Sequence, residues 1–234
     1  MSAYSRDIDV KASWPVEATD RMNRMYRRQR HIYDGTRRYY LLGRDRLIEN
    51  LKATAGASVL DVGCGTGRNL LHGARRFPGV RFFGIDVSTE MLTSAISSIS
   101  RRDLTTRIRV AHGDGTAFDP QALFGVPAFD HVMISYSLSM IPDWRRVLRA
   151  AVSHLKSGGS LHIVDFGNQE RLPGIARSLL RRWLAVFDVT PRDDLERELS
   201  AMAQSCGADL RFERPFRGYA QYAVMTFPPL PKAP

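Results

Sequence analysis

The sequence predicts an α/β domain in which helices cover both faces of a mostly parallel sheet. Apolar strand-like runs alternate along the chain with amphipathic helical segments, as in a doubly wound sheet. The chain of 234 residues is long enough for one such domain, and no linker rich in Pro, Gly or Ser divides it. An apolar strand at 58–62 runs directly into a glycine-rich turn, which indicates a ligand-binding loop within this fold.

The expected core elements follow in chain order. Strands are expected at 58–62, 81–85, 107–112, 129–135 and 160–166, and helices at 68–76, 88–98 and 143–155. We expect Ser88 to cap its helix and Gly158-Gly159 to turn into the strand that follows. Later elements are a helical insertion at 172–186, a helix at 192–206 and a hairpin of 210–215 with 219–227. Residues 1–50 are expected to form a basic helical cap of the same domain, 51–227 the core and 228–234 a loose tail.

The glycine-rich turn indicates a bound nucleoside. Gly63, Gly65 and Gly67 lack Cβ atoms where the chain must turn sharply and let a ligand approach the backbone. The helix after the loop opens beneath that ligand. Asp86 ends the second strand, where an acidic residue of this fold binds ribose hydroxyls.

The spacing of the glycines distinguishes two kinds of cofactor. A dinucleotide fingerprint reads G-x-G-x-x-G, whereas this chain has G-x-G-x-G with Asp61 before it. The tighter loop, with Gly113-Asp114 after the third strand, resembles motif I and its neighbours in the class I S-adenosylmethionine-dependent methyltransferases. The resemblance implies a Rossmann-like class I fold of seven strands in the order 3-2-1-4-5-7-6, with S-adenosyl-L-methionine as cofactor, S-adenosyl-L-homocysteine as product and no metal. A dinucleotide oxidoreductase is the less favoured alternative.

The same resemblance implies cofactor contacts around the loop. They are Asp61, Gly63, Cys64, Gly65, Gly67, Asp86, Val87, Met91, Asp114, Gly115 and Ser135. Met91 would cover the adenine ring or serve the core, and Asp114 would accept a hydrogen bond from the adenine amino group or shape a turn. Cys64 is expected mainly as a small residue. His112, His131 and His162 show no metal-ligand spacing and are expected to be structural.

The net charge of +10 points to a polyanionic partner, either an anionic membrane surface or nucleic acid. Only four of the 34 basic residues are lysines, so a preference for arginine explains the residue type but not the excess over 24 acids. We find no signal peptide, no apolar run of transmembrane length and no repeat, and we expect a cytoplasmic protein. The two cysteines form neither a disulfide framework nor a zinc set.

Two amphipathic segments bear on the partner. Residues 21–46 hold nine arginines and two acids among aromatic and aliphatic residues, which suits either a membrane surface or an ordinary covering helix. In 172–187, Leu172, Ile175, Leu179, Trp183 and Val186 recur at helical spacing, with Arg177 and Arg181 on another face. This second segment suits an interfacial helix or a helix packed on the sheet.

Several strings outside the cofactor motifs resemble the bacterial diacylglycerylhomoserine N-methyltransferases. They are Tyr26–Ile48, Cys64–Asn69, Tyr136–Trp144, Leu161–Gly167, Val189–Arg192 and Arg217–Ala220. The resemblance implies three methylations that yield the betaine lipid diacylglyceryl-trimethylhomoserine, at the inner face of the cytoplasmic membrane, alongside the enzyme that makes diacylglycerylhomoserine. The polar-Pro-Pro-aromatic sequence usual in adenine- and cytosine-methylating enzymes is missing after the fourth strand, which makes nucleic acid an unlikely substrate.

The resemblance also suggests roles in methyl transfer. Tyr33 and Tyr136 would line the transfer channel, and Asp165 and Gln169 would orient the amine or a water. Either Arg37 or Arg44 would hold the homoserine carboxylate in a bidentate pair, the alternative being an exposed salt bridge. A methyltransferase of phosphatidylethanolamine or a quinone precursor, and a binding protein without turnover, stay open.

Overall fold

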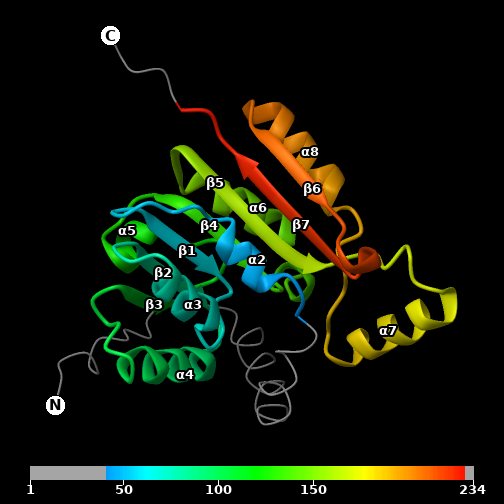
Figure 1. The fold of residues 1–234 in the computed structure, drawn as a ribbon, viewed down its shortest axis with the longest axis horizontal. Coiled ribbons are helices and arrows are strands. Elements are labelled where there is room, and N and C mark those ends of the chain that lie inside the picture. Colours follow the sequence, from blue (N-terminus) through cyan, green and yellow to red (C-terminus); the bar gives the residue numbers. More distant parts are fainter. Residues whose placement is uncertain (1–40, 230–234) are drawn as a thin grey trace.

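The computed structural model describes residues 41–229, which form a seven-stranded sheet with helices on both faces (Figure 1). The strands are β1 (Ser58–Val62), β2 (Arg81–Asp86), β3 (Ile108–His112), β4 (Phe129–Ser135), β5 (Leu155–Phe166), β6 (Asp209–Glu213) and β7 (Ala220–Thr226). Their order is β3-β2-β1-β4-β5-β7-β6, which confirms the predicted order. The first five pair in parallel, and β7 runs antiparallel to both β5 and β6. The predictions for Tyr33, Arg37 and most of the N-terminal cap lie outside the described residues.

The helices divide between the two faces of the sheet. They are α2 (Arg44–Glu49), α3 (Arg68–Arg76), α4 (Thr89–Ser100), α5 (Pro120–Phe124), α6 (Trp144–Ser153), α7 (Gly174–Val186) and α8 (Leu195–Cys206), with 3₁₀ turns η2 (Leu138–Met140) and η3 (Phe216–Gly218). Buried residues of α2, α3 and α4 share one apolar cluster, and those of α5, α6 and α8 share another. Every residue of β1 is buried, as expected for a central strand covered on both sides.

Most expected boundaries differ from the structure by two residues or fewer, and two differ by more. β5 begins at Leu155 rather than Ser160, because Leu155 already pairs with Phe129 of β4. The register shifts between this pair and the next, His131 with Ser160, so Gly158 and Gly159 lie within the strand. Gly158, with φ of 75°, therefore lies in an irregular stretch of strand and not in a turn that precedes it. The helix expected from 192 begins at Leu195.

Side-chain caps explain where helices α4 and α5 begin. The Ser88 side chain accepts a hydrogen bond from the backbone N–H of Met91 and so caps α4 as predicted. The short helix α5, which the sequence pattern did not indicate, starts from Asp119, whose side chain accepts bonds from the N–H groups of Gln121 and Ala122. No helix in the described part of the chain combines the length and apolar character of a membrane span.

Candidate functional site

The glycine loop lies at the carboxyl end of β1, against the end of β2. The backbone N–H groups of Gly63 and Cys64 both donate to the carbonyl of Ile85, at 2.9 and 3.0 Å. Gly63, Gly65 and Gly67 have φ angles of 75°, 54° and 75°, in the left-handed region that favours glycine. The loop then leads into α3, with Gly67 as the N-cap residue. The backbone N–H groups of the first turn of α3, which have no partner within the helix, therefore lie next to the loop.

Asp86 joins β2 to this loop. One carboxylate oxygen accepts a hydrogen bond of 2.8 Å from the N–H of Gly65, and the other accepts one of 2.9 Å from the N–H of Ser88. The side chain is nearly buried at 8% exposure. The acid selected from its spacing is thus beside the loop, as a ribose ligand would have to be.

Asp61 lies beneath the loop with one oxygen unsatisfied. The residue is fully buried, Asn69 donates a bond of 3.4 Å to Oδ2, and Oδ1 has no hydrogen-bond partner in the described structure. Burial raises the pKa of Asp61 to about 7; the charge of Asp86 adds to the rise, and the Asn69 bond and the charge of Arg44 oppose it. A buried acceptor of this kind suits a ligand that brings a donor, such as the amino group of S-adenosylmethionine.

The other predicted cofactor residues surround the loop. Met91 is buried but is not part of either apolar cluster, which leaves its adenine-covering role open. A carboxylate oxygen of Asp114 accepts a bond of 2.8 Å from the N–H of Thr116, the turn role that the sequence offers as the alternative to ligand binding. Ser135 ends β4 with a buried hydroxyl that has no partner in the described structure.

Three predicted contacts are defined mainly by backbone and packing. A Cβ added to Gly84 would lie 2.8 Å from the sulfur of Cys64, so the Cys64 side chain packs directly against β2. Burial raises the pKa of the Cys64 thiol. A Cβ on Gly115 would lie 2.8 Å from Val62, and the carbonyl of Val87 is 3.1 Å from Nε2 of His112.

An aromatic cluster stands at the ends of β4 and β5. Tyr136 adopts φ of 55°, and its hydroxyl donates a 2.6 Å bond to the carbonyl of Leu42. Its ring meets Phe166 edge-on with centroids 4.8 Å apart, and Phe166 meets Tyr219 at 5.8 Å. Burial, reinforced by the charge of Asp165, raises the pKa of Tyr136. The charge of Arg44 opposes the rise in the pKa of both Asp61 and Tyr136, so this arginine acts electrostatically on both groups.

Asp165 supports the loop after β4. Its carboxylate accepts bonds from the N–H groups of Ser139 and Phe166, at 3.1 and 2.7 Å, and it is fully buried. Burial raises its pKa to about 6, although hydrogen bonds from Ser139 and Phe166 and the charge of Arg192 lower it.

Gln169 is turned into the protein. It is fully buried, its amide nitrogen bonds the carbonyl of Gly167, and its oxygen accepts from Arg181 at 3.1 Å. Both polar ends are used, so a substrate contact through Gln169 would require these bonds to be exchanged.

Sequence reasoning assigned no role to three residues that organise the site. Asn69 bonds Asp61, and the Ser137 hydroxyl donates to the carbonyl of Val62 at 2.9 Å beneath the glycine loop. Arg192 donates to the carbonyls of Leu138 and Ile141, at 2.9 and 2.8 Å. All three stand within the strings that carried the family resemblance, which was the available signal.

The predicted structural histidines have protein partners: His112 contacts the carbonyl of Val87, and the other two form one pair. Ser160 links His131 and His162 with contacts of 2.8 Å, and burial lowers the pKa of His162 to about 3. Within residues 41–229, no group of three His, Cys, Asp or Glu side chains could hold a metal ion.

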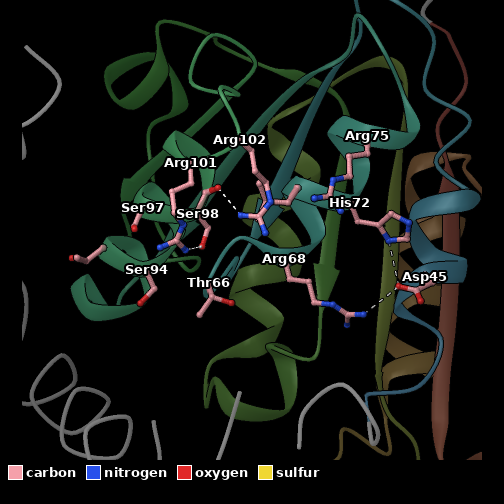
Figure 2. Close-up of a pocket in the computed structure, with 12 residues that line it drawn as sticks. Asp45, Thr66, Arg68, His72, Arg75, Ser94, Ser97, Ser98, Arg101 and Arg102 are labelled. Carbon is pink, nitrogen blue, oxygen red and sulfur yellow. Dashed lines mark hydrogen bonds and ion pairs between the residues drawn. The ribbon is translucent and has the colours of Figure 1, made fainter. Parts of the chain in front are cut away.

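A cavity of about 730 Å³ lies between α3 and α4 (Figure 2). It is lined by Arg68, Arg75, Arg101 and Arg102, with His72 and several hydroxyl side chains; Asp45, which pairs with Arg68 and His72, is its one acid. Asp61, Asp86 and Tyr136 do not line it. This groove is therefore distinct from the predicted cofactor site.

The sheet order, with the glycine loop and its two acids at the carboxyl end of β1, is that of the Rossmann-like fold of class I methyltransferases. Residues 59–159 match the family model described as a methyltransferase domain. A demethylmenaquinone methyltransferase of Listeria monocytogenes is 29% identical over 146 residues, 62% of this chain and 56% of that protein. Nocamycin O-methyltransferase of Saccharothrix syringae is 33% identical over 132 residues, 56% of this chain and 45% of that protein. The match thus spans about half of each relative's length.

A likeness among solved structures extends over most of the chain. Phosphoethanolamine N-methyltransferase 2 of Haemonchus contortus, solved with phosphomonomethylethanolamine and S-adenosylhomocysteine, superposes with a TM-score of 0.70. The superposition covers 92% of this chain and 61% of that one, at 16% identity. At that identity the likeness establishes the fold.

Proposed function

We propose that this protein is an S-adenosylmethionine-dependent N-methyltransferase that methylates the amino group of diacylglycerylhomoserine three times, giving diacylglyceryl-trimethylhomoserine. One observation carries the methyl-transfer part: Asp61 and Asp86 flank the glycine loop, and Asp61 keeps a buried oxygen with no partner in the described structure. Asp61 would hold the amino group of the cofactor and Asp86 its ribose. The bound cofactor would supply a methyl group on a positively charged sulfur.

The acceptor side supports an amine substrate. Tyr136, Phe166 and Tyr219 form a continuous set of rings, which suits a nitrogen that becomes permanently positive during the reaction. Arg44 brings a positive charge toward the same place and would hold the homoserine carboxylate. In this proposal Tyr136 lines the transfer path, together with Tyr33 from outside the described residues.

The proton on the amine needs an acceptor or must be absent. An amine beside its own carboxylate is mostly protonated at neutral pH, and the protonated form has no lone pair to attack the methyl group. Asp165, with a pKa of about 6, is mostly ionised at pH 7 and would orient the amine or a water that takes its proton. Alignment of the reacting atoms would then supply most of the rate enhancement.

The test is mass spectrometry of lipids from cells that express this chain with a source of diacylglycerylhomoserine. The expected result is a lipid carrying three added methyl groups, lost in Asp86→Ala. Purified protein with labelled cofactor should transfer label to diacylglycerylhomoserine in preference to phosphatidylethanolamine. Label on phosphatidylethanolamine alone would overturn the proposed acceptor but not the methyltransferase activity.

A quinone precursor is the second candidate acceptor. It is favoured by the demethylmenaquinone methyltransferases, 29% identical over 146 residues of this chain. Assays of the purified protein with demethylmenaquinone and with diacylglycerylhomoserine, at equal surface concentration in the same detergent, separate the two candidates. Either candidate acceptor would place the enzyme at the inner face of the cytoplasmic membrane, where such acceptors lie.

A further inference from the structure

Helix α7 carries apolar side chains on two opposite faces. Leu184 is 1% exposed, and Leu180 and Phe187 pack with it against the core. Ile175, Leu179, Trp183 and Val186 are 81%, 61%, 40% and 72% exposed. Their spacing of four, four and three residues places them along one stripe of the helix, away from Leu184. We call these four residues the α7 stripe.

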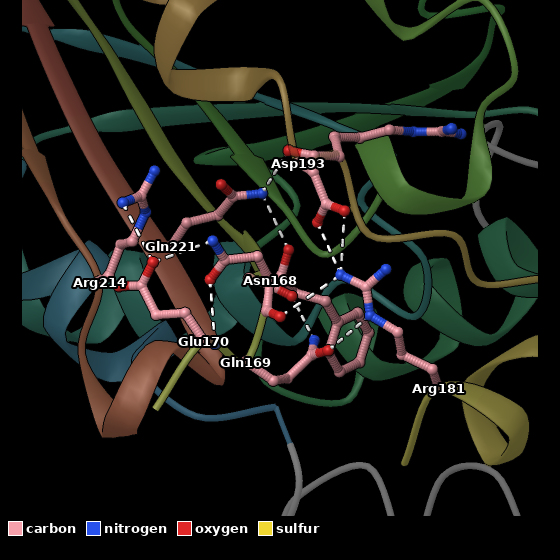
Figure 3. Close-up of polar contacts among 10 residues, drawn as sticks. Asn168, Gln169, Glu170, Arg181, Asp193, Arg214 and Gln221 are labelled. Carbon is pink, nitrogen blue, oxygen red and sulfur yellow. Dashed lines mark hydrogen bonds and ion pairs between the residues drawn. The ribbon is translucent and has the colours of Figure 1, made fainter. Parts of the chain in front are cut away.

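Polar contacts fix the rotation of α7 (Figure 3). Nη2 of Arg181 donates to both carboxylate oxygens of Asp193, at 2.8 and 3.0 Å, and Nε of Arg181 donates to the side-chain oxygen of Gln169. In Figure 3 the Arg181 side chain reaches from α7 toward Asn168 and Gln169, on the segment that leaves β5. With Leu184 buried on the core, these bonds hold the stripe outward.

Basic charge accompanies the stripe. The segment from Arg171 to Phe187 contains four arginines and no acidic residue. Arg171, Arg177 and Arg182 are exposed. An exposed apolar row with Trp, edged by arginine, matches a helix that lies in the headgroup region of an anionic bilayer.

The position of α7 relates the stripe to the candidate active site. The helix begins eight residues after Phe166, the last residue of β5, and in Figure 1 it stands beyond the tip of that strand. Phe216, half exposed in η3, is at the same end, because Gly218 accepts a bond from the N–H of Gln169. In the described part of the chain, all the large exposed apolar side chains therefore gather at the edge where Asp165 and Tyr136 lie.

We propose that the α7 stripe inserts into the surface of an anionic lipid bilayer and presents the carboxyl edge of the sheet to a lipid acceptor. The inference rests on the proposed function for its purpose, since a bilayer-embedded acceptor requires the site to face lipid. Insertion buries the stripe while Arg182, beside the stripe, and Arg171, before the start of the helix, meet lipid phosphates.

Charge argues against a second copy of this chain as the occupant. A two-fold dimer through the stripe would bring Arg182, which borders the stripe, close to Arg182 of the other copy, and the segment offers no acid to pair with it. A bilayer containing phosphatidylglycerol supplies the missing negative charge.

The test is vesicle flotation of the full chain with phosphatidylcholine alone or mixed with phosphatidylglycerol. Ile175→Ser/Leu179→Ser should lower the partition coefficient on mixed vesicles by about tenfold or more, because two exposed aliphatic side chains no longer insert. Arg171→Gln/Arg182→Gln should also weaken binding, whereas Arg146→Gln/Arg149→Gln, with the same charge change on α6, should have much less effect. Trp emission should shift to the blue on vesicles in the wild type and much less in Trp183→Phe.

Two outcomes would overturn the inference. One is unchanged vesicle binding in Ile175→Ser/Leu179→Ser, with folding verified by circular dichroism. The other is a wild-type dimer that these substitutions split in sedimentation experiments without a change in vesicle binding. If α7-dependent binding is found but no homoserine lipid is methylated, the proposed function fails while the inference stands. If both hold, the stripe variant should lose turnover on vesicles and keep it on detergent-dispersed acceptor.

Discussion

The carboxylate of Asp86 and the backbone N–H of Gly65 form a hydrogen bond of 2.8 Å that joins the end of β2 to the glycine loop. The other oxygen of the same carboxylate accepts from Ser88, which caps α4. One side chain thus joins the glycine loop to the start of α4. The ligand-binding and loop-shaping roles of Asp86 are therefore coupled.

Asp86→Ala should weaken binding of S-adenosylmethionine by about tenfold to a hundredfold, since hydrogen bonds to a charged group contribute about 1.5–3 kcal/mol. Isothermal titration calorimetry measures the change. Asp209→Ala, an exposed acid at the start of β6, is the matched control and should bind normally. Equal affinities in Asp86→Ala and the wild type would count against the whole cofactor assignment.

The buried carboxyl group of Asp61 is expected to lower the stability of the protein above neutral pH while it strengthens cofactor binding. Its pKa rises from 3.8 unfolded to about 7 folded, so between these pH values the folded protein holds a proton that the unfolded chain has released. Stability is therefore lost as pH rises through this window and stays lower above it. Asp61→Asn should raise Tm at pH 8 relative to the wild type, with a smaller gain at pH 5, and should bind the cofactor more weakly.

Differential scanning fluorimetry at both pH values, with and without cofactor, measures these effects. Asp130→Asn gives a control of opposite sign, because hydrogen bonds from Lys156 and Ser58 lower the pKa of Asp130 despite its partial burial. That substitution should reduce Tm at pH 8. A lower Tm for Asp61→Asn at pH 8, with cofactor binding intact, would contradict the assignment of an unsatisfied ligand-facing carboxylate.

The two central strands beside each other in the sheet were predictable. The expected and observed bounds of β1 and β4 agree, because each has a buried aliphatic segment, Val59-Leu60 in β1 and Val132–Ile134 in β4. The start of β5 was not predictable, because Gly158-Gly159 is typical of a turn. These glycines belong to a strand only because Leu155, three residues before them, pairs with Phe129. The strand order came from the family resemblance rather than from the local pattern.

The site was predictable where its residues are close in sequence. Asp61, Gly65 and Asp86 follow from a motif and a spacing. The bond from Tyr136 to Leu42 joins residues 94 positions apart and depends on an unusual φ of 55°, neither of which a pattern reveals. Gln169 was expected to meet substrate, but Arg181 from the following helix takes its side-chain oxygen.

Tyr136→Phe separates the ring of this tyrosine from its hydroxyl. The substitution removes the bond to Leu42 and should cost about 0.5–1.5 kcal/mol of stability, the usual net value of such a bond. If the ring lines the transfer path, kcat should change little in Tyr136→Phe and fall strongly in Tyr136→Leu. Denaturant unfolding and steady-state kinetics measure the two effects. Equal kcat for Phe and Leu at this position would exclude a role for the aromatic face.

Gly63 is where the glycine loop approaches the segment after β4 most closely. A Cβ there would lie 2.6 Å from the Cβ of Ser137, whose hydroxyl bonds Val62, so neither side can yield without moving the loop. Gly63→Ala should destabilise the protein by about 1–3 kcal/mol more than the backbone strain alone, the usual effect of overpacking. Gly56→Ala measures that strain, because Gly56 has φ of 87° and a Cβ added to it would meet no atom within 4 Å. Gly63→Ala should also reduce cofactor affinity, whereas Gly56→Ala should not. Equal unfolding free energies for the two variants in urea titrations would show that the loop does not depend on this contact.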